Sequence, residues 1–259
     1  MPFAKSKDVN IYFTESGSGD AIIFCHGIGG NSTVWWQQFG HFCSDYHCIA
    51  IDHRGFGRST CRAEQFDPRS FGDDAVAVLD AAGISSAHFV CQSMGGWTGV
   101  QAALKYPERV RSLTLSGTIG GFNLPSGLHA AATVKERIAA GTASTLALAS
   151  DFPQRQPALS FLFAEIGAFN TSLAGFDPVP RLVSEEVLVP LATAAELNMP
   201  ILMVAGEYDL IWGPDVIKEL QGYLPRSRLV EVKAGHSPYF ETPIEFNEIL
   251  GDFLRADVE

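Results

Sequence analysis

The sequence predicts an α/β protein with a mostly parallel sheet and helices on both of its faces. Three observations support this class: short apolar segments recur along the chain, segments of helical periodicity separate them, and glycine or polar residues directly follow the apolar segments. Apolar strands joined by helices are typical of parallel sheets, which are buried on both faces. The length of 259 residues suits one large domain of this kind.

Seven segments are predicted as strands because they are continuously apolar or alternate apolar with polar residues. They are residues 9–14, 21–25, 48–51, 87–91, 111–116, 201–205 and 229–232. Four segments are predicted as helices: residues 67–83, 96–106, 215–223 and 243–254. In the first helix, Phe71, Ala75 and Val78 recur at helical spacing and Gly83 ends the segment. Strands and helices therefore alternate at both ends of the chain.

The alternation breaks over residues 118–196, where no segment has the pattern of a strand. Ser126 and Gly141 suit the start and the stop of one helix there. The region is also rich in alanine and leucine, and it contains Phe161, Phe163, Phe169 and Phe176. We therefore predict a helical cap at residues 118–196, inserted into a core made of residues 1–117 and 197–259.

Charge and hydropathy exclude several classes of function. Lys and Arg total 18 and Asp and Glu total 29, so the formal net charge is −11. This balance argues against a nucleic-acid partner and against an anionic membrane surface. The apolar segments are far shorter than the roughly 20 residues that span a bilayer, and residues 1–8 lack the apolar core of a signal peptide. We expect a cytoplasmic protein whose partner is a small-molecule substrate.

Cysteine and histidine spacing gives no metal motif. The five cysteines are Cys25, Cys43, Cys48, Cys61 and Cys91, with no CxxC pair. Their odd number, and the position of three of them in apolar segments, predict buried free thiols in a reducing compartment. The seven histidines show no HExxH pattern. No metal and no cofactor are predicted.

Residues 90–96 carry the first chemical signal. Ser93 stands between an apolar strand and a helix, and Gly95 and Gly96 follow it. A serine on such a sharp turn lies at the N-terminus of the helix, where backbone N–H groups favour a developing negative charge. The glycines let strand and helix approach closely. Taken alone, the turn is compatible with Ser93 as a nucleophile and with Ser93 as a helix N-cap.

Residues 24–30 carry the second signal, a glycine-rich turn after another apolar strand. An oxyanion hole needs two backbone donors that are fixed before the charge forms. The N–H groups of Ile28 and Met94 are the candidates. A phosphate-binding loop and a plain turn are the alternatives, although neither a GxGxxG nor a GxxxxGK[ST] pattern is present.

Together these segments resemble the α/β-hydrolase family over nearly the whole chain. The matching motifs are His26-Gly27, residues 52–59, and Ser93 with the three residues that follow it. The resemblance implies the α/β-hydrolase fold with an eight-stranded sheet, and a triad in the chain order serine, acid, histidine. Cys91 departs from the family pattern G-x-S-x-G at its first glycine. We expect the small cysteine to preserve the turn with a tighter fit.

Candidates for the acid and the histidine follow the last two predicted strands. Asp209 follows the first of these strands and His236 follows the second. In the triad that the resemblance implies, His236 takes the proton from Ser93, and Asp209 orients the imidazole and stabilises its charge. Glu207 and Asp215 compete for the acid role, but Glu207 comes two residues earlier and Asp215 suits the first turn of a helix.

These residues predict a serine hydrolase that cleaves a carboxylic ester or lactone through an acyl-enzyme. The apolar content of residues 118–196 predicts a pocket for a small, largely apolar substrate. The candidate lining residues are Phe122, Leu128, Phe161 and Phe169. Other prominent residues have structural interpretations: His26 orders its own turn, Asp52 and Arg54 hold loops together, and Trp97 packs in the core.

Three alternatives remain open. The resemblance covers small carboxylesterases, enol-lactonases and carbon–carbon bond hydrolases without separating them, and the last of these use the same serine and histidine on a vinylogous diketone. A cofactor-free oxygenase on this fold would carry an acid near the sixth strand of the family's eight-stranded sheet. The corresponding segment here, residues 111–116, ends in Ser116-Gly117-Thr118 with no acid, which argues against an oxygenase. A ligand-binding receptor that retains the three side chains is the third alternative.

Overall fold

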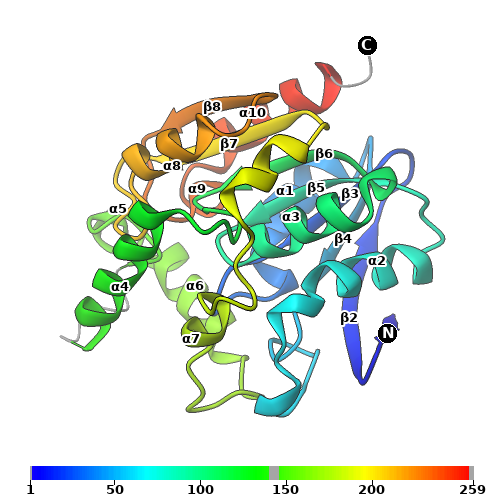
Figure 1. Ribbon diagram of the computed structural model, residues 1–259, viewed down its shortest axis with the longest axis horizontal. Coiled ribbons are helices and arrows are strands. Elements are labelled where there is room, and N and C mark those ends of the chain that lie inside the picture. The colour runs from blue at the N-terminus through cyan, green and yellow to red at the C-terminus, as the bar shows by residue number, and fades with distance from the viewer. Residues whose placement is uncertain (1, 140–145, 257–259) are drawn as a thin grey trace.

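The computed structural model describes residues 2–139 and 146–256. Its centre is one eight-stranded sheet in the order β1-β2-β4-β3-β5-β6-β7-β8 (Figure 1). The strands are β1 (Phe3–Ser6), β2 (Val9–Ser16), β3 (Ala21–Cys25), β4 (His47–Ile51), β5 (Ala87–Gln92), β6 (Val110–Ser116), β7 (Ile201–Gly206) and β8 (Ser227–Val232). The β1–β2 and β2–β4 pairs are antiparallel, and all other pairs are parallel. The predicted mostly parallel sheet is confirmed.

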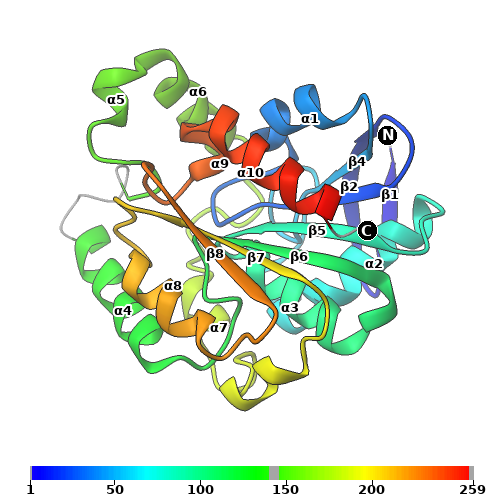
Figure 2. The ribbon, with the colours of Figure 1, turned by 90° about the horizontal axis from the view of Figure 1, so that it is seen from above.

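Helices cover both faces of this sheet. Figure 2 shows α1 (Trp36–Phe42) and α10 (Pro243–Ala256) on one side, and α2 (Phe71–Ala81), α3 (Gly95–Lys105) and α8 (Pro214–Gln221) on the other. The short helix α9 (Pro238–Glu241) precedes α10. Short 3-10 helices lie at Ser32–Trp35, Ala63–Gln65, Pro68–Ser70, Pro107–Arg109 and Leu191–Glu196.

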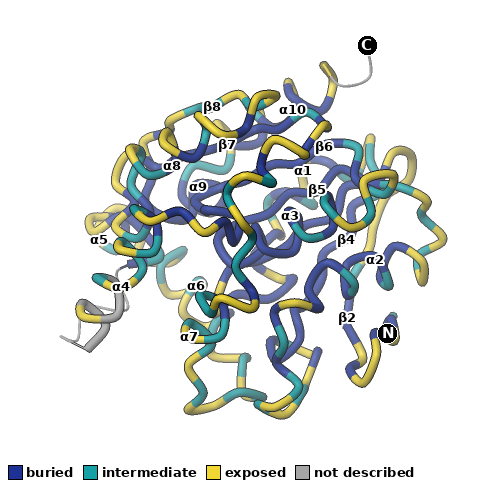
Figure 3. Tube along the Cα trace, in the orientation of Figure 1, coloured by how far each residue is buried: buried dark blue, intermediate teal, exposed yellow. Residues whose placement is uncertain are grey.

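The two faces of the sheet form two separate cores, because successive side chains of a strand point to opposite sides. In β3, Ile23 and Cys25 pack with the core under α2, α3 and α8, whereas Ile22 and Phe24 pack with the core under α1 and α10. Figure 3 shows the inner strands β3, β4, β5, β6 and β7 as buried along most of their length. The continuous apolar pattern of these strands follows from this burial on both faces.

In the described part of residues 118–196, four α-helices gather beyond one end of the sheet (Figure 1). They are α4 (Pro125–Ala139), α5 (Phe152–Arg155), α6 (Pro157–Ala168) and α7 (Val179–Leu182). Among the described residues of this 118–196 segment, β-pairing is limited to the isolated bridge between Phe122 and Val189. Gly141, predicted as a helix stop, lies outside the described residues.

The first strand and the start of α2 differ from the sequence predictions, and the helix predicted to start at Ser126 begins one residue earlier, at Pro125. The strand β1 was not predicted, because its four residues carry too short an alternation; they gain strand structure by pairing with β2. The helix predicted at residues 67–83 begins later, at Phe71. Asp67 instead caps a 3-10 turn with its side chain, which accepts the Arg69 N–H, and Pro68 starts that turn.

The fold buries a neutral histidine within β5. His88 is 1% exposed, its Nδ1 lies 2.8 Å from Ser112 Oγ, and its Nε2 has no partner among the described residues. Burial, with a contribution from the nearby Arg111 charge, lowers the pKa of His88 to about 4. Because the folded chain then binds fewer protons than the unfolded chain between about pH 4 and 6.5, stability rises with pH in that window.

We predict that His88→Gln flattens this pH dependence by about one proton, or about 1.4 kcal/mol per pH unit. Urea unfolding at pH 4.5, 5.5 and 7 measures the slope. His41→Gln is the control, because His41 is exposed, and it should keep the slope of the unmodified chain. An equal slope for His88→Gln would contradict the assignment of a buried neutral imidazole.

Candidate active site

The candidate residues lie where strands of the parallel sheet end. Ser93 follows β5, Asp209 follows β7 and His236 follows β8. Parallel strands present their carboxyl ends at the same edge of a sheet, where ligand sites of open α/β folds form. Residues far apart along the chain are thereby brought to one edge.

Ser93 occupies a strained turn between β5 and α3. Its φ is 50°, and among the described non-glycine residues only Lys7 shares a positive φ. The turn is held on three sides: the Ser93 N–H donates to Ser116 O at 3.0 Å, and Ser93 O accepts from Gly96 N–H at 2.8 Å and Thr118 Oγ1 at 2.7 Å. This is the geometry expected for a nucleophile elbow, whereas a helix N-cap needs no positive φ.

Glycines make the turn possible by close backbone approach. A Cβ atom on Gly95 would overlap the carbonyl oxygen of Cys25 in β3, so α3 could not sit where it does. The unusual Cys91 is accommodated in the same way, because its Sγ would lie 2.6 Å from a Cβ atom on Gly99. Cys91 on β5 is larger than the glycine of the family pattern, and Gly99 on α3, which has no side chain, leaves room for it.

The loop after β3 is arranged to turn one amide outward. The Gly27 carbonyl accepts from His26 Nδ1 at 2.7 Å and from the Gly30 N–H at 3.1 Å. In a trans peptide the Ile28 N–H points opposite to this carbonyl. Neither the Ile28 N–H nor the Met94 N–H donates to a group of the described residues. Both predicted donors are thus free to serve an oxyanion.

A buried layer supports this loop. His26 Nε2 accepts the His53 N–H at 3.0 Å, and the His53 ring contacts Thr98 Oγ1 at 2.7 Å. Burial lowers the pKa of His26, and it lowers that of His53 well below its usual value, so both rings are neutral. Asp52 accepts the N–H groups of Ser32 and Arg58. His26 thus orders its own turn through ring hydrogen bonds, and Asp52 makes the loop contacts predicted for it.

Arg54, the other residue predicted to hold loops together, is buried against helix α2. Its guanidinium donates to both carboxylate oxygens of Asp74, at 2.7 and 2.6 Å, and to the Gln65 carbonyl at 2.9 Å. This two-pronged pair fixes the loop after β4 to α2.

The carboxylate of Asp209 joins His236 to the end of β7. Asp209 Oδ2 lies 2.9 Å from His236 Nδ1, and Oδ1 accepts the N–H groups of Ile211 and Trp212. Because the carboxylate accepts, Nδ1 carries the hydrogen and Nε2 is left basic. The competing acids Glu207 and Asp215 are exposed to solvent. Gln92 Nε2 also donates to the His236 carbonyl at 3.1 Å, which joins the end of β5 to the loop that carries His236.

Ser93 and His236 open into one cavity of about 190 Å³. The cavity is smaller than the roughly 300–1,000 Å³ typical of ligand pockets. Apart from the serine and the histidine, its lining is aliphatic or aromatic. The residues are Ile28, Trp97, Ala131, Leu146, Ala147, Val179, Leu182, Val183, Ile211 and Trp212. Six of these ten belong to the 118–196 segment, so that segment forms part of the wall.

The four predicted lining residues lie elsewhere. Phe122 is fully buried in the core beneath the segment, and Leu128 lies on α4 outside the cavity lining. Phe161 and Phe169 are 68% and 73% exposed, respectively, on the surface of the segment. The apolar character of the segment was predicted, but which of its faces meets the cavity depends on how its helices dock.

Two tryptophans in the cavity wall were missed as site residues. Trp97 Nε1 donates to the Leu182 carbonyl at 3.1 Å, and Trp212 Nε1 donates to the Gly127 carbonyl at 3.2 Å. Both indoles therefore fasten the 118–196 segment and present only hydrocarbon to the cavity. Their sequence signal was proximity, because they stand four residues after Ser93 and three after Asp209.

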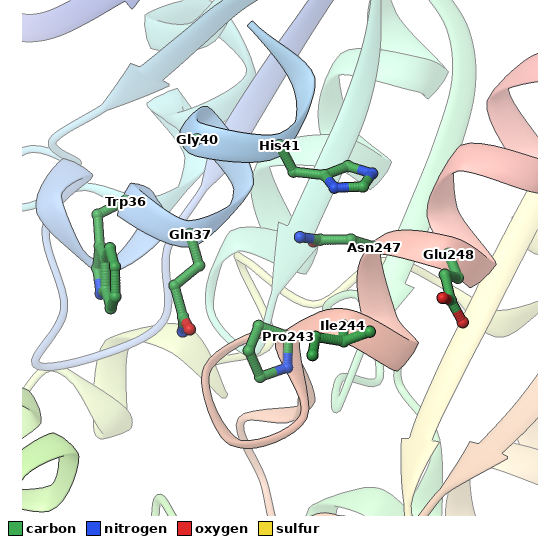
Figure 4. Close-up of a pocket in the computed structure, with 8 residues that line it drawn as sticks. All are labelled: Trp36, Gln37, Gly40, His41, Pro243, Ile244, Asn247 and Glu248. Atoms are coloured by element: carbon green, nitrogen blue, oxygen red, sulfur yellow. The ribbon is translucent and has the colours of Figure 1, made fainter.

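A larger depression of about 400 Å³ lies between α1 and α10 (Figure 4). Its eight lining residues include His41 and Glu248 but no serine or cysteine. Volume alone therefore does not identify the reactive site. Within the described residues, no group of three or more His, Cys, Asp or Glu side chains is placed to hold a metal ion. No helix there is long and apolar enough to cross a membrane.

Comparison with known proteins agrees with this geometry. A family model described as alpha/beta hydrolase fold matches residues 20–243. The chain is 31% identical over 251 residues to 2-hydroxymuconate semialdehyde hydrolase of Pseudomonas sp. (strain CF600), covering 93% of this chain and 88% of that protein. It is 29% identical over 265 residues to a RutD protein of Azorhizobium caulinodans named for carbamate hydrolysis, covering 98% of each.

Among solved structures, Est816 is described as an N-acyl homoserine lactone degrading enzyme. It is 29% identical to this chain, with a TM-score of 0.81, and the match covers 97% of this chain and 100% of that one.

We predict that Gly95→Ala destabilises the fold by about 1–3 kcal/mol, because the added methyl group meets backbone rather than a movable side chain. The midpoint of urea unfolding measures the effect. Gly40→Ala is the matched control, since a Cβ atom there meets nothing within 4 Å. An unchanged midpoint for Gly95→Ala would mean that α3 and β3 are not in contact at this point.

Proposed function

Because the chain belongs to the α/β-hydrolase fold family, we propose that it is a serine hydrolase acting on a carboxylic ester or lactone. One observation carries the proposal. The strained Ser93 and His236, whose Nδ1 is paired with Asp209, border the same small apolar cavity. Ser93 is the nucleophile, His236 the general base and Asp209 the residue that orients it.

The reaction proceeds by acyl transfer to water. Ser93 Oγ attacks the carbonyl carbon while His236 Nε2 takes the hydroxyl proton. The C–O bond to the leaving group then breaks, and His236 returns the proton to the departing alkoxide. For a lactone, this alcohol stays attached to the acyl group. Water, deprotonated by His236, attacks the acyl-enzyme and releases the carboxylic acid and free Ser93.

The Ile28 and Met94 amides stabilise the oxyanion of each tetrahedral intermediate. His26 and Gly30 hold the Gly27 carbonyl, so the Ile28 N–H is oriented before the charge forms. Met94 is the N-cap residue of α3, where the helix dipole adds to the effect. Removing one such donor costs on the order of 2.7–4 kcal/mol in activation free energy in related chemistry.

The cavity favours a small substrate with an aliphatic or aryl group. Its wall offers hydrocarbon from two indoles and several aliphatic side chains, and both indole N–H groups are already bonded. The similarity to the lactone-degrading Est816 supports an ester or lactone. Residues 118–196 act as a cap over this site, inserted between core residues 1–117 and 197–259.

The free thiols of the five cysteines support a cytoplasmic location.

Hydrolysis of a carbon–carbon bond is the second candidate. It is favoured by the 31% identity to 2-hydroxymuconate semialdehyde hydrolase, whose named substrate is a conjugated enol with a carbonyl group. The same serine and histidine would serve this reaction. Release of a carboxylic acid from a vinylogous diketone, without activity on esters and lactones, would favour it over the first proposal.

We predict that Ser93→Ala lowers kcat/KM for p-nitrophenyl esters by at least about 10³-fold, because the acyl-enzyme cannot form. Hydrolysis is followed at 405 nm by nitrophenolate release. Ser237→Ala, a change at a buried serine next to His236, is the control for a small local loss of packing. Turnover that persists undiminished in Ser93→Ala would refute the proposed function.

We predict that Ala131→Leu narrows the acyl range. Ala131 lines the cavity, so a larger side chain there fills space needed by long acyl groups. The hexanoate-to-acetate ratio of kcat/KM should fall by about tenfold or more. Ala132→Leu is the matched control, because Ala132 is the exposed neighbour on the same helix. Equal hexanoate-to-acetate ratios for Ala131→Leu and Ala132→Leu would mean that the acyl group does not lie beside Ala131.

A further inference from the structure

Glu241 is a buried carboxylate outside the three proposed catalytic residues. It ends α9 and is 8% exposed. Burial raises the pKa of its carboxyl, although the hydrogen bonds that it accepts from backbone N–H groups favour the charged form. A buried carboxylate is costly unless its oxygens are satisfied, so its partners define its role.

Those partners come from two different parts of the chain. Oε1 accepts the N–H groups of Gly235 at 3.0 Å and of Ser237 at 3.3 Å, the two residues that flank His236. Oε2 accepts the N–H of Ala149 at 2.9 Å, in the 118–196 segment. One side chain therefore holds the loop of the proposed base and the backbone beside the cavity wall.

The two parts also touch directly. A Cβ atom on Gly235 would overlap the Ala149 nitrogen and would lie 2.6 Å from the Leu148 carbonyl carbon. The residues just before this contact, Leu146 and Ala147, line the cavity. This junction thus fixes the position of the cavity wall at residues 146–149 relative to His236.

We propose that Glu241 is a positioning residue that sets His236 and the cavity wall at residues 146–149 in one fixed arrangement. The inference rests on the proposed function, because it gives His236 the role of the base. It assigns no contact between Glu241 and the substrate. Its effect on turnover is exerted through the two segments that it holds.

Glu241→Gln tests the proposal with almost no change in size. An amide nitrogen cannot accept a hydrogen bond, so at least one of the three N–H groups loses its partner. We predict a fall in kcat of about 10- to 100-fold, the effect of a displacement of roughly 1 Å in a catalytic group. The hexanoate-to-acetate ratio of kcat/KM should also move towards one, because the wall loosens together with the base.

Glu245→Gln is the matched control, because Glu245 is exposed four residues further on. Hydrogen exchange measured by mass spectrometry gives a readout that does not depend on activity. Peptides covering residues 146–152 and 233–240 should both exchange faster in Glu241→Gln and be unchanged in Glu245→Gln. Glu241→Asp, which keeps the charge but reaches less far, should recover part of kcat.

The outcomes separate this proposal from the proposed function. Turnover in Ser93→Ala defeats the function, and the exchange data still decide whether the junction exists. If Ser93→Ala is inactive, Glu241→Gln with unchanged kcat and chain-length ratio overturns the positioning role. A lower melting temperature with both kinetic values unchanged also overturns it, since that result describes a residue of stability alone.

Discussion

The contact between the start of α3 and the end of β3 is the constraint on which the site depends. Gly95 lies against the Cys25 carbonyl, and no side chain fits between them. This approach brings the helix N-terminus to the carboxyl edge of the sheet and forces Ser93 to a φ of 50°. This backbone conformation is unfavourable by on the order of 1–3 kcal/mol, and the hydrogen bonds around Ser93 stabilise it.

The same contact brings the two proposed oxyanion donors into relation with the serine. Met94 is carried by the turn itself, and Ile28 belongs to the loop that continues β3 beyond Cys25. A Cβ atom on Gly27 would lie 2.9 Å from Ser93 Cβ, so the loop and the elbow are in direct contact. A shift of α3 would therefore move the proposed nucleophile and separate the proposed oxyanion donors at the same time.

The sequence predicted the residues whose roles follow from strand order. Ser93, Asp209 and His236 each follow an apolar segment, and parallel strands bring such positions to one edge whatever the loops between them. Asp209 was favoured over Glu207 and Asp215 for the proposed acid role, and it is the acid that contacts His236. Asp209 lies in the turn that directly follows β7, so its place at the edge of the sheet could be predicted from its position after an apolar segment.

The cavity wall could not be predicted in the same way. An apolar helix in residues 118–196 shows that a face is buried, not whether it meets the sheet, another helix or a substrate. Phe122 packs into the core and Phe161 is exposed, whereas Ala131 and Val179 line the cavity. Glu241 was missed for a related reason, because its partner Ala149 is 92 residues away and no local pattern joins them.

Two kinds of hydrogen bond, from indole N–H groups and to a buried carboxylate, hold residues 118–196 against the core beside the cavity. The indole N–H groups of Trp97 and Trp212 and the carboxylate of Glu241 all bond to backbone groups of the segment. Backbone partners fix the position of the segment without adding polar groups to the cavity wall. Ser93 and His236 are the polar side chains that border the cavity. For the proposed reaction, we therefore expect discrimination among substrates to come from the volume and shape of the cavity, which depend on how closely the segment is held to the sheet.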